Sequence, residues 1–261
     1  MLRKMENMTW LEMADAVKET DTVLVPIGAI EMQGPHLPLV VDSLAAQYVA
    51  EKVAEKTNTV LAPLINVGTS EWHKYFPGII SLSKTTLLEY LRDYCNSLVL
   101  NGFKRILFFS PHVINDDVIA SVGLELREKG ILVGSVNLWH ISAEIVQNKN
   151  IEFEEKNFTH AGEIMTSVIM AIAPELVKMD KAETEYPRTP IPDTPFAGLH
   201  KLKYRDTSFS IFRFSNEETT SGSLGNPMAA TPEKGQKVID GWLEVIVPFV
   251  GEFQKCTDST C

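Results

Sequence analysis

The feature that most constrains the fold is an alternation of short apolar runs with amphipathic stretches of helical period. Four runs are rich in Val, Ile, Leu and Phe, as strands buried on both faces are: residues 23–27, 59–65, 105–110 and 131–138. Five stretches have the spacing of helices with one apolar face: residues 43–56, 85–100, 114–129, 161–172 and 232–253. Because alternating strands and helices build a parallel sheet covered on both sides, we predict a three-layer α/β/α fold with a mainly parallel central sheet.

Local signals mark where several of these helices begin and end. Thr9 and Glu12 have capping-box spacing at the start of a further amphipathic helix. Asn101 and Gly102 form a C-terminal stop signal after residues 85–100. Pro232 occupies the first turn of the last helix, where the missing N–H is harmless.

Regularity breaks down between residues 178 and 220. Pro187, Pro190, Pro192 and Pro195 exclude a helix there and favour an extended excursion, either a lid or an interface between subunits. The alternation over residues 208–214 then predicts a strand with one apolar face. We see no internal repeat and no linker, so residues 1–261 are predicted to form a single domain.

Charge and hydropathy exclude several classes of protein. The formal net charge of −10 argues against nucleic acid as a partner, because phosphate binding requires a basic surface. The amino-terminal segment lacks the apolar core of a signal peptide, and no apolar run reaches the roughly 18 residues of a membrane helix. We therefore expect a soluble, cytoplasmic protein without a nucleic-acid or membrane partner, and the acidic charge indicates nothing about its substrate.

The densest group of polar side chains directly follows the first predicted strand. Glu31, Gln33, His36 and Asp42 lie on a segment that Gly and Pro residues keep irregular, at the carboxyl end of the strand, where parallel sheets place their sites. A mixture of carboxylate and imidazole suits Zn²⁺ or Mn²⁺. Polar loop residues and a helix-capping acid account for the same pattern without any cation.

Two further segments bring related side chains to this edge of the sheet. His112 follows the strand predicted over residues 105–110, and so it arrives beside the first loop if the two strands are neighbours. Thr159 and Glu163 have the spacing of a helix cap and a first-turn acid. Alternatively, Glu163 completes a metal site and His160 transfers a proton. Spacing alone does not choose between these two interpretations.

Five fragments, in order along nearly the whole chain, resemble the creatininase (creatinine amidohydrolase) family. Residues 31–39, Glu-Met-Gln-Gly-Pro-His-Leu-Pro-Leu, are similar to the family's Glu-Gln-His-Gly-Pro-His-Leu-Pro-Leu. Residues 160–163, His-Ala-Gly-Glu, are identical to the family's run. The other resembling fragments are residues 70–78, 110–115 and 225–235. The chain is identified as a member of this family on these motifs.

The resemblance implies a metal-dependent hydrolase. Carried over by position, Glu31 and His112 bind one cation, Asp42 bridges toward a second, and Glu163 is an acidic ligand of that second cation. Gln33 stands where the family places an imidazole, and a neutral amide oxygen is a weaker donor for Zn²⁺. We therefore predict one firm site for Zn or Mn and a second site that is weakened, altered or absent. Gln33 contacting substrate instead is an equal alternative.

The implied reaction is attack on a carbonyl by water that the cation activates. His160 or a ligand carboxylate such as Glu163 protonates the leaving group. His73 and Trp139 are candidate substrate-binding residues together with Gln33 and His36. The burial typical of Trp favours a core position for Trp139, and His36 is better explained as a side chain that orients a ligand. His140 and His200 belong to no motif and are predicted to be surface or core residues.

The family's range of reactions leaves the substrate open. Its members open cyclic amides, cleave formamides, act on peptide-like bonds or hydrolyse ring ketones of oxidised cyclitols. Ile114 stands where creatininases proper place a ligand Glu, which argues against creatinine as substrate. Gln33 and the polar residues expected around the pocket favour a small polyhydroxylated or cyclic carbonyl compound, such as an oxidised cyclitol of the 3-dehydro-scyllo-inosose type. The alternative is an inactive binding or regulatory module that kept the fold. The resemblance also implies a symmetric homo-oligomer, often a hexamer.

Overall fold

The computed structural model describes residues 2–149, 151–155, 158–198 and 200–256. A five-stranded sheet in the order β1-β3-β2-β4-β5 forms its centre, and every neighbouring pair is parallel. The strands are β1 (Arg3–Lys4), β2 (Thr22–Pro26), β3 (Val60–Leu61), β4 (Arg105–Phe109) and β5 (Leu132–Val136). The predicted parallel sheet is confirmed.

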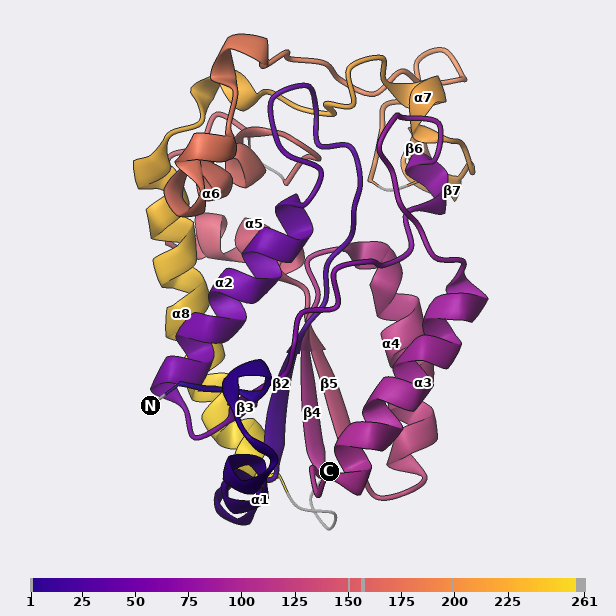
Figure 1. Ribbon diagram of the computed structural model, residues 1–261. Helices are drawn as coiled ribbons and strands as arrows, with labels where there is room; N and C mark the ends of the chain where they lie inside the picture. Colours follow the sequence, from indigo (N-terminus) through magenta and orange to yellow (C-terminus); the bar gives the residue numbers. More distant parts are fainter. Residues whose placement is uncertain (1, 150, 156–157, 199, 257–261) are drawn as a thin grey trace.

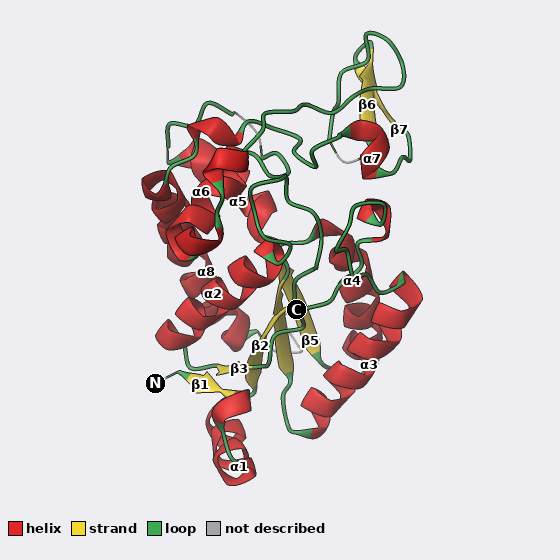
Figure 2. Cartoon of the chain, turned by 45° about the horizontal axis from the view of Figure 1, so that its top comes forward, coloured by secondary structure: helices red, strands yellow, loops and turns green. Residues whose placement is uncertain are grey.

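Helices cover both faces of this sheet, as Figures 1 and 2 show. One layer contains α2 (Val41–Lys56), α5 (Leu138–Asn148), α6 (Glu163–Ile172) and α8 (Pro232–Lys255). The other layer contains α3 (Lys84–Leu100) and α4 (Val113–Arg127), and α1 (Trp10–Glu19) packs against the same core through Ala16. The three-layer α/β/α fold is therefore confirmed.

Two apolar cores lie between the sheet and its helical layers. Leu24 of β2 faces the core formed with α2, α6 and α8, whereas its neighbours Val23 and Val25 face the core formed with α3 and α4. All three side chains are fully buried. Successive residues of a strand point to opposite faces, so burial of both faces requires the continuous apolar runs seen in the sequence.

The local signals have the predicted roles. Thr9 and Glu12 form a capping box at the start of α1. Gly102 follows the end of α3 with a φ of 101°, a left-handed conformation that glycine adopts without strain. Thr231 caps α8 with its side chain, and Pro232 is the first residue of that helix.

Two elements of the sheet region differ from the prediction. β3 pairs over Val60–Leu61 only, rather than over residues 59–65, because Pro63 interrupts the run. Beyond this proline, a single bridge joins Ile27 to Ile65. α5 was not predicted: the strand expected over residues 131–138 ends at Val136. The side chain of Asn137 then accepts a hydrogen bond from His140 N and begins the helix.

The strand predicted over residues 208–214 forms over only part of that range, and its apolar face is exposed. β7 (Thr207–Ser210) pairs with β6 (Lys201–Tyr204) in an antiparallel hairpin, and a short helix, α7 (Ser215–Glu218), follows. Phe209 is 53% exposed and Phe212 81% exposed, so the alternation does not produce a buried face. The hairpin stands apart from the main sheet, beyond the carboxyl ends of its strands (Figure 2).

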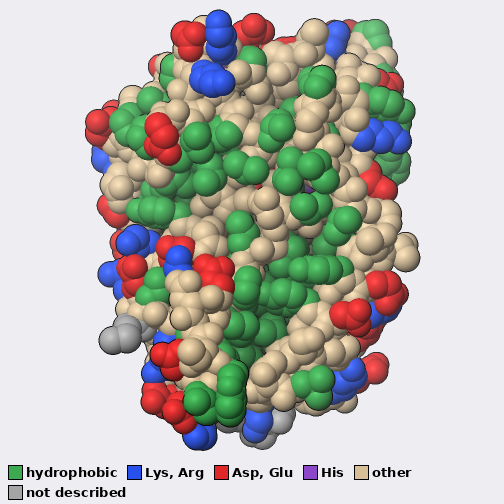
Figure 3. Space-filling model, in the orientation of Figure 1, with side chains coloured by type: hydrophobic (Ala, Val, Ile, Leu, Met, Phe, Trp, Pro, Cys, Tyr) green, Lys and Arg blue, Asp and Glu red, His purple; other side chains and the backbone are tan. Residues whose placement is uncertain are grey.

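Side chains of different kinds are unevenly distributed over the face of the molecule drawn in Figure 3. Charged side chains lie mainly along the margins of the face drawn in Figure 3, and hydrophobic side chains gather toward its middle. Across the described residues, no helix combines the length and the apolar character that crossing a membrane requires.

Candidate metal centre

Segments that carry polar side chains singled out in the sequence lie at the carboxyl edge of the sheet, just above the strands in Figure 1. Glu31 lies on the loop that follows β2, and His112 follows β4 as the N-cap residue of α4. The sequence analysis placed Asp42 on the irregular loop, but the residue lies in the first turn of α2. Because β2 and β4 are neighbours in the sheet, their two following segments are side by side.

Glu31, Asp42 and His112 converge on one point. His112 Nδ1 lies 3.2 Å from Glu31 Oε2 and 3.5 Å from Asp42 Oδ2. All three side chains are buried. One ligand atom of each lies within 4.8 Å of the others, a spacing that one cation bound to all three would require.

The surrounding hydrogen bonds orient each of these groups. His112 Nε2 lies 2.6 Å from the carbonyl oxygen of Thr69, which only accepts, so Nε2 carries the proton and Nδ1 presents its lone pair to the carboxylates. Trp139 Nε1 donates to Asp42 Oδ1 at 2.7 Å, and Ser70 Oγ donates to Glu31 Oε2 at 3.0 Å. Outer partners of this kind fix ligands in metal sites, and the donor set fits Zn²⁺ or Mn²⁺.

The charges around His112 favour positive charge at this point. Burial raises the pKa of the Glu31 carboxyl, but His112 and His73 outweigh burial and hold that pKa well below its ordinary value. Burial lowers the pKa of His112, and the carboxylates of Glu31 and Asp42 more than reverse this and raise it. Two buried carboxylates thus require a counter-charge, which a proton or a cation supplies.

Glu163 is not brought into this group. Its carboxylate accepts hydrogen bonds from Glu154 N at 2.7 Å and Glu155 N at 2.9 Å, and it forms an ion pair with Lys234. The side chain is fully buried. This geometry gives Glu163 a role in fixing the chain before α6, and it does not support the predicted roles as metal ligand and proton donor.

Gln33 and His36 lie beneath the pocket and do not line it. Gln33 Nε2 donates to Glu31 Oε1 at 3.0 Å, so the amide nitrogen faces the carboxylate, while Oε1 has no hydrogen-bond partner in the described part of the chain. His36 Nε2 lies 2.9 Å from Thr166 Oγ1, and burial lowers the pKa of His36 to about 4. Gln33 thus orients Glu31, and neither side chain is placed for the predicted contact with substrate.

His73 and His160 form a second group with Glu31. His73 Nε2 lies 3.5 Å from Glu31 Oε2, and its ring stacks on that of His160 with 5.2 Å between centroids. One ligand atom each of Glu31, His73 and His160 again lies within 4.8 Å of the others. Burial lowers the pKa of His73 to about 3, so its imidazole is neutral near pH 7.

A pocket of about 850 Å³ opens above both groups. Aromatic side chains form much of its wall: Trp72, Trp139, Phe158, Tyr186 and Phe196. The proline-rich excursion contributes residues from Tyr186 to Gly198, which settles its position over the pocket. Trp72, His140 and Phe158 were not predicted as pocket residues, because single aromatic or His residues in a helix or loop carry no sequence signal of their own.

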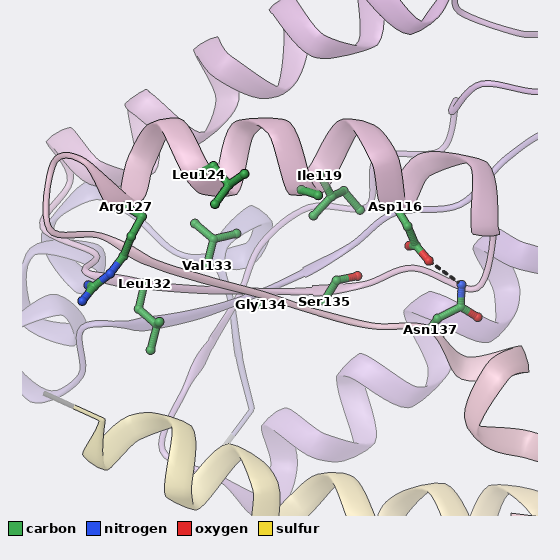
Figure 4. Close-up of a pocket in the computed structure, with 11 residues that line it drawn as sticks. Asp116, Ile119, Leu124, Arg127, Leu132, Val133, Gly134, Ser135 and Asn137 are labelled. Carbon is green, nitrogen blue, oxygen red and sulfur yellow. Dashed lines mark hydrogen bonds between the residues drawn. The ribbon is translucent and has the colours of Figure 1, made fainter. Parts of the chain in front are cut away.

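A second hollow of about 510 Å³ runs along β5 and contains none of the predicted ligands (Figure 4). Asp116 lies at one end, where it accepts a hydrogen bond from Asn137 at 2.8 Å, and Arg127 lies at the other. Leu124, Leu132 and Val133 line the space between them. The two groups of side chains able to hold a cation therefore lie at the first pocket and not at this one.

Residues 6–250 match a protein-family model described as creatininase, creatinine amidohydrolase. The chain belongs to the creatininase family. It is 26% identical to the creatinine amidohydrolase of Pseudomonas putida, covering 94% of this chain and 95% of that protein. It is 31% identical to the mycofactocin precursor peptide peptidase of Mycolicibacterium smegmatis, covering 83% and 78%. It is 23% identical to the 3-dehydro-scyllo-inosose hydrolase of Thermotoga maritima, covering 96% and 83%.

Solved creatininases share the fold. A structure described as Mn creatininase superposes with a TM-score of 0.80 at 24% identity, covering 98% of this chain and 100% of the other. A variant described as the Zn-Zn type superposes with a TM-score of 0.79 at the same identity and coverage. The named relatives in this creatininase family are hydrolases, and the described residues supply groups able to hold a cation.

Proposed function

We propose that the protein uses water to open the ring of a small cyclic carbonyl substrate by breaking a ring bond at the carbonyl carbon, and that Glu31, Asp42 and His112 hold the divalent cation that the reaction requires. The observation that carries this proposal is the orientation of His112, whose Nε2–H is committed to Thr69 O while Nδ1 faces Glu31 and Asp42. A divalent cation at such a point lowers the pKa of water from 15.7 toward about 7 and polarises a carbonyl oxygen.

The cation is proposed to be Zn²⁺ or Mn²⁺. One imidazole and two carboxylates form a mixed nitrogen and oxygen donor set, which suits these ions better than Ca²⁺ or Mg²⁺. The related creatininases described as Mn and Zn-Zn forms support the same choice. Trp139 and Ser70 keep the carboxylates in place through their hydrogen bonds.

His160 is the side chain proposed to carry the proton. Its Nε2 lies 2.8 Å from the carbonyl oxygen of Met32, so Nε2 donates and Nδ1 keeps a lone pair. The ring is half-buried and lines the pocket. An imidazole in this position takes a proton from the attacking water and returns it to the leaving group, a role that contributes roughly 10²–10⁴-fold in rate.

The pocket favours a flat or cyclic substrate, either a cyclic amide or an oxidised cyclitol. Trp72, Trp139 and Phe196 offer aromatic faces beside the charged floor. Ile114 also lines the pocket, where the resemblance implies a ligand Glu in creatininases proper. This apolar wall favours a substrate other than creatinine.

The test is a screen of protein reloaded with Zn²⁺ or Mn²⁺ against cyclic amides, ketocyclitols and short peptides. We expect turnover that is lost on chelation and restored by the cation. His160→Ala should lower turnover by about 10²-fold or more while the first equivalent of cation still binds. Turnover that is unchanged after complete removal of the cation would contradict the proposal.

A further inference from the structure

Glu31 Oε2 lies against imidazoles of two different groups. His112 Nδ1 is 3.2 Å away and His73 Nε2 is 3.5 Å away. His73 belongs to the short 3-10 helix Glu71–His73, and His160 precedes α6, so neither is near Glu31 in the chain. Their convergence is a product of the tertiary structure, not of local spacing.

Each of the two additional imidazoles has a hydrogen-bond partner on one ring nitrogen, as metal-ligating histidines commonly do. His160 Nε2–H donates to Met32 O at 2.8 Å, which leaves the lone pair on Nδ1. His73 Nδ1 lies 2.6 Å from Ser215 Oγ, and donation from Nδ1 to this hydroxyl leaves the lone pair on Nε2, the atom that faces Glu31. A ligating His almost always donates its other N–H to such a partner.

We propose that Glu31, His73 and His160 form a second site for a divalent cation of the Zn²⁺ or Co²⁺ class. Two imidazoles and one carboxylate match the preference of these ions, and three protein donors leave a position open toward the pocket, which His73 and His160 both line. This site differs from the second site that the family resemblance implies, because it uses neither position 33 nor Asp42. The inference rests on the proposed function, since Glu31 is shared with the first cation.

The second site has a consequence for catalysis. The two cations share Glu31 and repel each other, so the second binds more weakly than the first. A cation on His160 also occupies the lone pair that the proposed function uses to carry a proton. Turnover should therefore rise with the first equivalent of cation and fall as the second site fills.

The experiment is a titration of metal-free protein with Co²⁺, followed by calorimetry and by the visible absorption of the bound ion. We expect two equivalents that separate by variant. Asp42→Asn should weaken the first equivalent by at least about tenfold and retain the second. His73→Asn should remove the second and retain the first. His140→Asn removes an exposed imidazole of the same pocket that belongs to neither group and should retain both equivalents.

Folding is checked by thermal unfolding without metal, and His160→Asn serves as a second variant if His73→Asn fails to fold. The second site is overturned if the protein binds a single equivalent that Asp42→Asn abolishes, while His73→Asn and His160→Asn bind it like the native protein. That result leaves the proposed function standing. Two equivalents insensitive to both His variants also overturn it. Binding of no equivalent at all overturns the proposed function as well.

Discussion

The floor and the cover of the pocket are built in opposite ways. We call Glu31, Asp42 and His112 the pocket floor and residues 186–198 the pocket cover. The floor side chains are at most 5% exposed and are fixed by hydrogen bonds at the end of the sheet. The cover is largely exposed and contributes no strand to the main sheet. From this contrast we expect changes in the floor to affect the chemistry most and changes in the cover to affect the choice of substrate most.

The largest effect is expected for a change in the floor. Glu31→Gln removes the carboxylate charge that both proposed cation sites share, and turnover should fall by at least about 10³-fold because several kcal/mol of metal assistance are lost. The loss is measured by steady-state turnover rates and by the amount of metal bound per chain.

Glu163→Gln is the matched control, since Glu163 is an equally buried carboxylate paired with Lys234 outside the floor. That variant should lose stability and keep its cation. Equal loss of metal in both variants would contradict the division between these two carboxylates.

A smaller effect is expected for a side chain that holds a floor residue in place by a hydrogen bond. Trp139→Phe keeps an aromatic ring stacked on Phe158 but removes the N–H that donates to Asp42 Oδ1. Affinity for the first cation should fall by roughly 10–100-fold, as measured by competition with a chelating dye. Trp242→Phe, which loses a similar bond to Ser142 Oγ, should leave that affinity unchanged.

The cover should change binding more than chemistry. Phe196→Ala removes a half-buried ring from the pocket wall, and a loss of about 1 kcal/mol of apolar contact should raise KM roughly fivefold with kcat nearly unchanged. Phe212→Ala removes a ring from the same excursion that is 81% exposed and outside the pocket lining. A large fall in kcat for Phe196→Ala alone would show that the cover takes part in the chemistry.

The smallest effect concerns acid stability beneath the floor. Burial lowers the pKa of His36 from 6.5 to about 4, so folding favours the neutral ring. This contribution is fully present above the unfolded-state pKa of about 6.5 and is lost as pH falls toward 4. Between pH 7 and pH 5.5, the lowered pKa of His36 should reduce the free energy of unfolding by about 1 kcal/mol. Denaturant unfolding of the native protein and His36→Gln measures it; equal pH slopes would contradict the assignment.

The fold was predictable because its signals are local and repeated. Residues 23–27 and 105–110 read as buried strands, and β2 and β4 are strands fully covered on both sides. The strand predicted over residues 208–214 is shorter than predicted and its apolar face is exposed, because an alternating pattern also occurs in an exposed hairpin. Periodicity reports a possible face, and only tertiary packing decides whether that face is buried.

The candidate site was predictable in part. Glu31, Asp42 and His112 follow strands or begin helices at one edge of the sheet, so the topology alone brings them together. The partner of Glu163 and the meeting of His73 with Glu31 depend on side-chain placement between distant segments. No spacing in the sequence encodes those contacts.

The most direct test of the central claim is the metal content of protein purified without chelators, compared with that of Asp42→Asn. We expect about one Zn or Mn per chain after dialysis in the native protein, and much less in the variant at unchanged fold. Native protein that contains no divalent metal, and takes none up on incubation with Zn²⁺ or Mn²⁺, would contradict the account.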